Sequence, residues 1–144
     1  MPRLNVLSSL NTRRRLGRQM PRKPLDFDAV RAIGLALPDV VESTSYGAPS
    51  LKIGKQLLAC PAIHKSAEPN SLIVRIPLAD RDRLLEEQPA VYYVTDHYVN
   101  YACILVRLSA IRRDALRELF GNAWRFVMEQ AQHSARKRGN RRRR

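Results

Sequence analysis

The sequence has few of the features that mark membrane, secreted or disulfide-stabilised proteins. No apolar run approaches the roughly 20 residues of a transmembrane helix, and residues 1–25 have no continuous apolar stretch of the kind found in secretory signals. The only two cysteines, Cys60 and Cys103, lie in apolar, strand-like runs, where cysteine usually behaves as a small buried hydrophobic residue. We therefore expect a soluble, cytoplasmic protein that does not bind a membrane.

Sites for covalent or metal chemistry are scarce as well. There is no Gly-rich phosphate loop, and neither Ser45 nor Cys103 lies on a sharp, Gly-flanked turn with a histidine partner. The nearest pair of metal-ligand residues is Cys60 with His64, and no second pair with ligand spacing accompanies it. We expect no metal, no cofactor and no enzymatic activity.

Acidic residues are few, and the excess of positive charge lies at the two ends of the chain. The 144 residues include 26 Lys and Arg against 13 Asp and Glu, a formal net charge of +13. Residues 1–25 hold seven basic and no acidic residues, residues 126–144 hold seven basic residues and Glu129, and residues 26–125 hold twelve of each sign. This distribution predicts a disordered basic arm over 1–24, a folded domain over 25–131 and a disordered basic tail over 132–144.

Basic tails attract polyanions, so the expected partner is nucleic acid, most simply DNA bound with low sequence specificity. The N-terminal arm has two further interpretations. Its Arg-rich and Ser-rich composition without acidic residues also resembles an organellar transit peptide. Alternatively, Met20 is the true initiator, which would remove five of the seven basic residues.

Hydrophobic periodicity predicts an α+β fold. Helices are expected over 25–37, 77–88 and 112–131, because apolar residues recur there at helical spacing between Pro or Asp boundaries. Strands are expected over 51–53, 56–60, 71–76, 91–94 and 102–108, with Gly54 and Lys55 as a two-residue hairpin turn. Strands joined by short turns, with helices on one side, favour a single domain in which helices back an antiparallel β-sheet.

The stretch 91–108 holds four of the five tyrosines, and the rest of the domain is expected to be organised around it. Polar and aromatic side chains at strand ends often bind ligands, so we predict a pocket lined by Tyr46, Asp96, His97, Tyr98 and Tyr101. Tyr98 and Tyr101 should be at least half buried. The alternative is a polar loop with one tyrosine folded onto the core.

Six basic residues of the folded domain are candidates for nucleic-acid contacts: Lys52, Lys55, Arg75, Arg107, Arg112 and Arg113. Lys52 and Lys55 flank the hairpin turn, from which a β-wing could reach a groove of DNA. The alternative is that they are solvated charges that protect strand edges from aggregation.

Segments in the same order and spacing as a known family run from about Leu25 to Arg125. They are Ala36-Leu37-Pro38, Ser43-Thr44-Ser45-Tyr46-Gly47-Ala48-Pro49, Lys52 with Gly54-Lys55, Ser71-Leu72-Ile73-Val74-Arg75, Val94-Thr95-Asp96-His97-Tyr98, Tyr101, Leu105-Val106-Arg107-Leu108 and Ala123-Trp124-Arg125. On these segments the chain resembles the MmcQ/YjbR family of small bacterial proteins. Ala102 and Cys103 depart from the Pro and bulky residue of many members, and Arg112 replaces a frequent Asp.

The resemblance implies a CyaY-like, double-wing-like α+β fold and a non-enzymatic, DNA-binding role, with no established catalytic residue. A frataxin-like fold also raises the question of iron. Iron handling in frataxins is associated with an acidic first helix, whereas here Asp26 and Asp28 are followed by Arg31 and no acidic ridge. The alternative function is a module that binds a small ligand or peptide in the Tyr- and His-lined pocket, either without catalysis or as an enzyme. A third is an interaction domain that dimerises through its exposed sheet edge.

Overall fold

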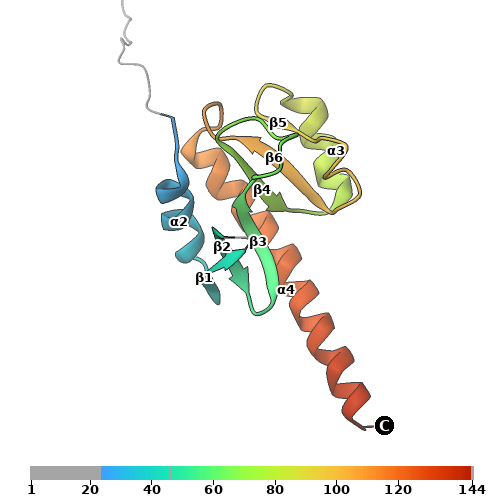
Figure 1. Cartoon of the computed structure of the whole chain (residues 1–144). Coiled ribbons are helices and arrows are strands. Elements are labelled where there is room, and N and C mark those ends of the chain that lie inside the picture. Colours follow the sequence, from blue (N-terminus) through green and yellow to red (C-terminus); the bar gives the residue numbers. More distant parts are fainter. Residues whose placement is uncertain (1–23, 46, 144) are drawn as a thin grey trace, which may run out of the picture.

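A six-stranded antiparallel sheet with helices packed on one face forms the domain (Figure 1). The computed structural model describes residues 24–45 and 47–143, except for the side chains of residues 45, 142 and 143. Its helices are α2 (Phe27–Leu35), α3 (Leu78–Glu87) and α4 (Arg113–Arg143). The strands are β1 (Val40–Ser45), β2 (Ala48–Ile53), β3 (Gln56–Pro61), β4 (Ser71–Arg75), β5 (Tyr92–Tyr93) and β6 (Cys103–Arg107), arranged in the order β1-β2-β3-β4-β6-β5. The predicted α+β class is confirmed.

Local signals explain where α2 and the first hairpin begin and end. The Asp26 side chain accepts a hydrogen bond of 3.1 Å from the backbone N–H of Ala29, which caps the first turn of α2. Gly54 has φ of 60°, a left-handed conformation that glycine adopts without strain, and it turns β2 into β3. The β-hairpin predicted at this position is therefore present.

The core lies between the sheet and α2 with α4. Alternation along β4 and β6 sends one set of side chains to the helices and the other set to the opposite face. The fully buried residues of the helix-covered face include Leu72, Val74, Ile104, Val106, Leu116, Phe120 and Val127. A Cβ on Gly34 of α2 would lie 2.4 Å from Leu51 Cδ1, so this glycine allows the helix to approach the sheet closely.

The opposite face of the sheet, here called the open face, carries a smaller cluster of Tyr98, Cys103 and Leu105, with Ile73 and Tyr93 packed against it. None of the described helices covers this cluster; the loops 62–70 and 94–102 approach it instead. The β3 to β4 pairing runs only from Pro61 with Leu72 to Ala59 with Val74. The first residues of β3 pair with β2 alone, so the sheet forks beside Arg75, the last residue of β4.

Two sequence predictions were wrong in this region and at the C-terminus. Tyr98 is buried as expected at 7% exposure, but Tyr101 is 61% exposed, because its backbone groups and not its ring are held by the domain. Residues 132–143 continue α4 as a helix, where low hydrophobicity predicted a disordered tail. Forming the first turn of a helix is unfavourable, and packing on the core stabilises that turn in the first half of α4. Arg, Lys, Gln and Ala are good helix formers, so the helix then extends past its last apolar contact.

Candidate functional site

A pocket of about 750 Å³ lies on the open face, at the fork between β3 and β4. Its floor is apolar and comes from neighbouring strands, with Leu57 and Cys60 from β3, Ile73 from β4 and Cys103 from β6. The two loops supply the walls: Ile63 and His64 from one, and His97, Tyr98, Tyr101 and Ala102 from the other. Ala48, Pro61 and Arg75 complete the lining, and Arg75 lies directly across the β4 to β6 pair from Cys103.

Three aromatic rings form one wall of the pocket. The imidazoles of His64 and His97 stack with centroids 3.5 Å apart and planes 6° from parallel. The ring of Tyr98 meets both edge-on, at 4.7 Å from His97 and 6.2 Å from His64. Edge-to-face packing is a favoured aromatic geometry, so Tyr98 supports the imidazole pair from the buried side.

Hydrogen bonds tie the two loops together around this wall. The backbone N–H of His64 donates to the Tyr98 hydroxyl at 3.4 Å, and the hydroxyls of Ser66 and Thr95 share a hydrogen bond of 2.9 Å. The N–H of Ser66 donates to Nδ1 of His64 at 3.1 Å. Because Nδ1 accepts, the proton of the neutral His64 ring lies on Nε2.

Arg81 of α3 holds the second loop from behind. It is 7% exposed, and its Nη1 donates to the backbone carbonyls of Val99, Tyr101 and Cys103 at 3.1, 3.0 and 3.4 Å. One guanidinium thereby donates to three backbone carbonyls, two in this loop and one at the start of β6. Arg81 therefore helps to position this wall of the pocket, together with the hydrogen bonds between the two loops.

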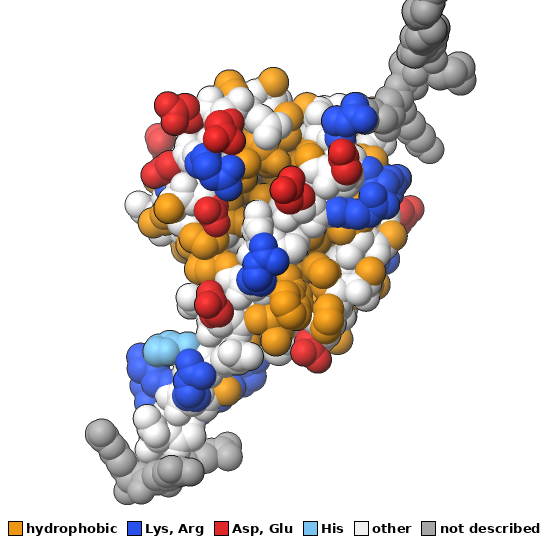
Figure 2. Space-filling model, turned by 180° about the vertical axis from the view of Figure 1, so that it is seen from behind, with side chains coloured by type: hydrophobic (Ala, Val, Ile, Leu, Met, Phe, Trp, Pro, Cys, Tyr) orange, Lys and Arg blue, Asp and Glu red, His pale blue; other side chains and the backbone are white. Residues whose placement is uncertain are grey.

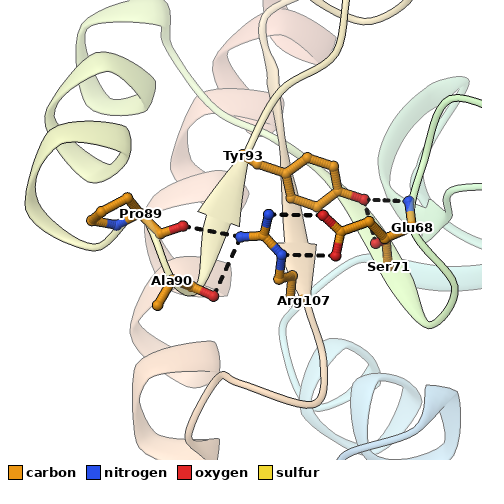
Figure 3. A network of polar contacts seen from close by, with 6 residues as sticks. All are labelled: Glu68, Ser71, Pro89, Ala90, Tyr93 and Arg107. Atoms are coloured by element: carbon orange, nitrogen blue, oxygen red, sulfur yellow. Dashed lines mark hydrogen bonds and ion pairs between the residues drawn. The ribbon is translucent and has the colours of Figure 1, made fainter.

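A second polar network lies further along the open face, around Arg107 (Figure 3). Its guanidinium forms a bidentate ion pair with Glu68 at 2.8 and 2.9 Å and lies 4.3 Å from the centroid of the Tyr93 ring. It also donates to the carbonyls of Pro89 and Ala90. The Tyr93 hydroxyl accepts from the N–H of Glu68 at 2.8 Å and shares a hydrogen bond of 2.5 Å with Ser71 (Figure 3). Arg107 therefore joins β6, β5 and the 62–70 loop.

The protonation of the pocket groups follows from burial. Burial raises the pKa of the Cys60 thiol to about 11, although nearby Lys52 opposes the shift. Burial also raises the pKa of Cys103, against the opposing charges of Arg81 and Arg75. Both thiols are therefore protonated at neutral pH and are poor nucleophiles. Burial, with the neighbouring His97 and Lys65, lowers the pKa of His64, so this imidazole is neutral at pH 7.

Within residues 24–45 and 47–143, no group of three or more His, Cys, Asp or Glu side chains could hold a metal ion. His64 and His97 stack face to face, so their nitrogen lone pairs, which lie in the ring planes, do not converge on one point.

No described helix is long and apolar enough to cross a membrane.

The structure brings together part of the predicted pocket. His97, Tyr98 and Tyr101 line it, Asp96 is exposed and does not, and Tyr46 lies outside the described residues. The sequence indicates His64 only as a partner for Cys60 in a metal site, whereas in the structure His64 stacks on His97. No sequence signal marks a contact between loops 33 positions apart (97 − 64), although both histidines stand at the ends of strand-like runs.

The predicted nucleic-acid residues lie in several places and do not form one patch. Lys52 is half buried on β2, Lys55 is exposed in the hairpin turn, and Arg75 lines the pocket. Arg112 is exposed beside Asp114, at 3.6 Å, and Arg113 begins α4. Arg107 is engaged in the network with Glu68.

The basic residues gather instead at the end of α4. Figure 2 shows the Lys and Arg side chains clustered where this helix leaves the body of the domain, while charges of both signs alternate elsewhere on that face. The segment 132–144 has seven basic residues and no acidic one: Arg136, Lys137, Arg138, Arg141, Arg142, Arg143 and Arg144. The described side chains from 136 to 141 are all exposed.

Comparisons with known proteins show the fold. No known family model matches the chain. The chain is 28% identical over 111 residues to the uncharacterized proteins Rv2570 of Mycobacterium tuberculosis and Mb2600 of Mycobacterium bovis, over 67% of this chain and 83% of each relative. The crystal structure of Deinococcus radiodurans protein DR2400, a DUF419 domain, matches with a TM-score of 0.61 at 16% identity, over 78% of this chain and 85% of that one. The chain therefore has the α+β fold of a solved DUF419 protein.

Proposed function

We propose that this protein is a non-enzymatic DNA-binding protein of the MmcQ/YjbR family, which binds the phosphate backbone through the basic end of α4. The observation that carries the proposal is the extension of α4 beyond the domain as an exposed helix with positive charge only. We also propose that the protein is cytoplasmic. Both of its cysteines are free thiols, as is usual in the reducing cytoplasm.

The length of the projecting segment suits a groove of duplex DNA. The last residues of α4 that pack on the core are Val127, Met128 and Ala131. Residues 132–143 follow, and twelve residues (143 − 131) at 1.5 Å each span about 18 Å. The DNA major groove is about 12 Å wide and admits a helix.

The distribution of charge around the helix also fits a groove. Successive residues of an α-helix are about 100° apart, so Arg136, Lys137 and Arg138 point in three different directions. Charges on all sides can reach the phosphates on both walls of a groove, whereas a single stripe would reach one. Because these contacts involve phosphates and not base edges, we expect low sequence specificity.

The rest of the described domain offers less to a polyanion. Residues 26–125 contain twelve basic and twelve acidic residues, and Arg31, Arg83 and Arg107 are among those in ion pairs. Family membership is supported by the motif segments and by the shared fold of the DUF419 protein, a domain related to the MmcQ/YjbR-like fold. The relatives are uncharacterized, so the helix itself is the main support.

Charge neutralisation in the full chain tests the proposal. One variant changes Arg136, Lys137, Arg138 and Arg141 to Gln; its matched control changes the exposed Lys55, Arg112, Arg113 and Arg117 to Gln, the same loss of four charges. Affinity for a random-sequence DNA duplex is measured across salt concentrations. Each phosphate contact removed lowers the slope of log affinity against log salt by about 0.9, so the α4 variant should lose several units.

The control separates specific placement from net charge. If α4 binds the DNA, the control variant keeps most of the slope and most of the affinity at physiological salt. An equal loss in both variants would mean that net charge alone acts, and a larger loss in the control would place binding on the hairpin and the start of α4. Either result contradicts the proposal.

A further inference from the structure

DNA binding through the end of α4 leaves the pocket on the open face without a role. Its volume of about 750 Å³ falls within the roughly 300–1,000 Å³ of small-molecule sites. Like those sites, it combines an apolar floor with a few polar groups at its margin. The side chains of Leu57 and Ile73 belong to that floor, and Tyr101 at the rim is 61% exposed.

The charge of the pocket is one-sided. None of its lining residues is acidic, and Arg75 is a permanent cation among them. Among the described residues Arg75 forms no ion pair; its guanidinium lies 5.6 Å from the centroid of the Phe126 ring. Arg107 on the same face is fully engaged with Glu68, so Arg75 is the guanidinium left for an anion here.

The opposite wall supplies aromatic surface and a neutral donor. His64 holds its Nδ1 toward the N–H of Ser66, which leaves Nε2–H as the donor of the ring. Tyr98 and His97 pack edge to face and both line the pocket, so this wall is aromatic. A single guanidinium suits one carboxylate better than a phosphate dianion, because the apolar floor offers nothing to a second negative charge.

We propose that this pocket binds an aromatic carboxylate, with the ring system on the apolar floor between Ile73 and the Tyr98 wall and the carboxylate paired with Arg75. None of the lining residues of this site belongs to α4; the Arg75 guanidinium lies near Phe126, in the packed half of that helix and not in its basic end. The protein would then carry two anion sites of different chemistry: one for a polyanion and one for a small, largely apolar monoanion.

Titration of the full chain with 2-naphthoate, followed by amide NMR, tests this assignment. The expected result is saturable shifts in residues 60–64, 73–75 and 97–103 while residues 132–143 stay unchanged. The neutral match 2-naphthalenemethanol has the same ring system without the charge, and it should bind about ten-fold more weakly or worse, the effect of losing a charge-assisted hydrogen bond.

Three variants of the full chain assign the anion contact. Arg75→Gln should remove the preference for naphthoate over the alcohol, and Arg75→Lys should keep part of it. Arg112→Gln, the matched loss of one exposed arginine outside the pocket, should change neither affinity. Thermal unfolding of each variant shows whether the fold is kept; if Arg75→Gln does not fold, the Lys variant and the alcohol comparison still decide.

Three results would overturn the proposal: equal binding of acid and alcohol by the wild-type protein, an unchanged preference in Arg75→Gln, or shifts confined to the end of α4. Binding of naphthoate by the variant with four Gln residues in α4 should equal that of wild type. Loss of naphthoate binding in that variant would also count against a separate site, whatever its effect on DNA.

Discussion

In residues 113–127 of α4, apolar side chains pack on the sheet and on α2, whereas residues 132–143 have no large hydrophobic side chain and extend past the domain (Figure 1). Helix formation requires a costly nucleus, which tertiary packing stabilises, and then adds residues at little cost. The first half of α4 thus makes the second half helical. The comparison teaches that one continuous helix can stabilise the fold at one end and present an exposed, positively charged segment at the other.

The largest expected effect is on the packed half. Phe120 is fully buried against the sheet and α2, so Phe120→Ala removes a large core side chain and leaves a cavity. We expect a loss of about 3–5 kcal/mol in the free energy of unfolding, measured by urea denaturation. The α4 variant with four Gln residues should unfold within about 0.5 kcal/mol of wild type, since those side chains are exposed. A comparable loss in the two variants would erase the distinction between the halves.

Substitution of two helical glycines should change the free energy of unfolding by an intermediate amount. An added Cβ at Gly34 would lie 2.4 Å from Leu51 Cδ1 and 3.1 Å from Phe120, whereas nothing lies within 4 Å of one at Gly121. Overpacking costs about 1–3 kcal/mol, and helix propensity favours Ala over Gly by about 1 kcal/mol. Urea denaturation should therefore show Gly34→Ala as destabilising and Gly121→Ala as stabilising. Stabilisation by both would show that α2 is not tightly packed on the sheet.

Trp124 tests the anchoring of α4 to the turn after α2. Its Nε1–H donates to the Pro38 carbonyl at 2.8 Å. Trp124→Phe keeps an aromatic ring and removes this donor, so we expect a loss of about 0.5–1.5 kcal/mol in the free energy of unfolding. Thermal unfolding with Arg125→Gln, an exposed neighbour, as control would measure it. No difference between the two variants would mean that this hydrogen bond contributes nothing.

The smallest effect concerns Gly139, in the projecting half, which has open space around its Cβ position. Gly139→Ala should raise the far-ultraviolet helix signal, because Ala is favoured by about 1 kcal/mol per residue. The global unfolding midpoint should not change, since this segment does not pack on the core. DNA affinity should rise by a few-fold at most, through preorganisation. A raised midpoint would show that the projecting half does contribute to the fold.

Lowering the pH should destabilise the folded protein through His64 in the pocket wall. Its pKa is lowered in the folded protein, so the folded state disfavours the protonated ring. The stability that this histidine contributes is complete above its unfolded pKa of about 6.5 and is lost as the pH falls through the lower folded pKa. His64→Gln should flatten the dependence of stability on pH over this range.

Periodicity was sufficient to predict the elements whose apolar pattern is regular. The strand over 71–75 and the short helix after Pro77 were predicted within one or two residues, because alternation and a Pro boundary define them locally. Strand 91–94 was predicted too long: only Tyr92 and Tyr93 pair with β6.

The candidate site was predictable only in part. His97 and Tyr98 stand in one polar stretch, but the stack of His64 on His97 depends on two loops meeting in space. Tyr98 and Tyr101 are chemically alike and three residues apart, yet only the first is buried, because the loop turns between them. Composition alone cannot predict the helix over 132–143, because a basic segment of this length becomes helical only when a stable helix precedes it.

Mapping the DNA contact on the intact protein tests the central claim most directly. The full chain, labelled with ¹⁵N, is titrated with a short DNA duplex at physiological salt, and amide signals are followed along the sequence. We predict that residues 133–143 shift or broaden, while residues 52–55 in the β2 to β3 hairpin and residues 107–113 do not. Shifts centred on Lys52 and Lys55, with the end of α4 unchanged, would contradict the account and assign DNA binding to the hairpin.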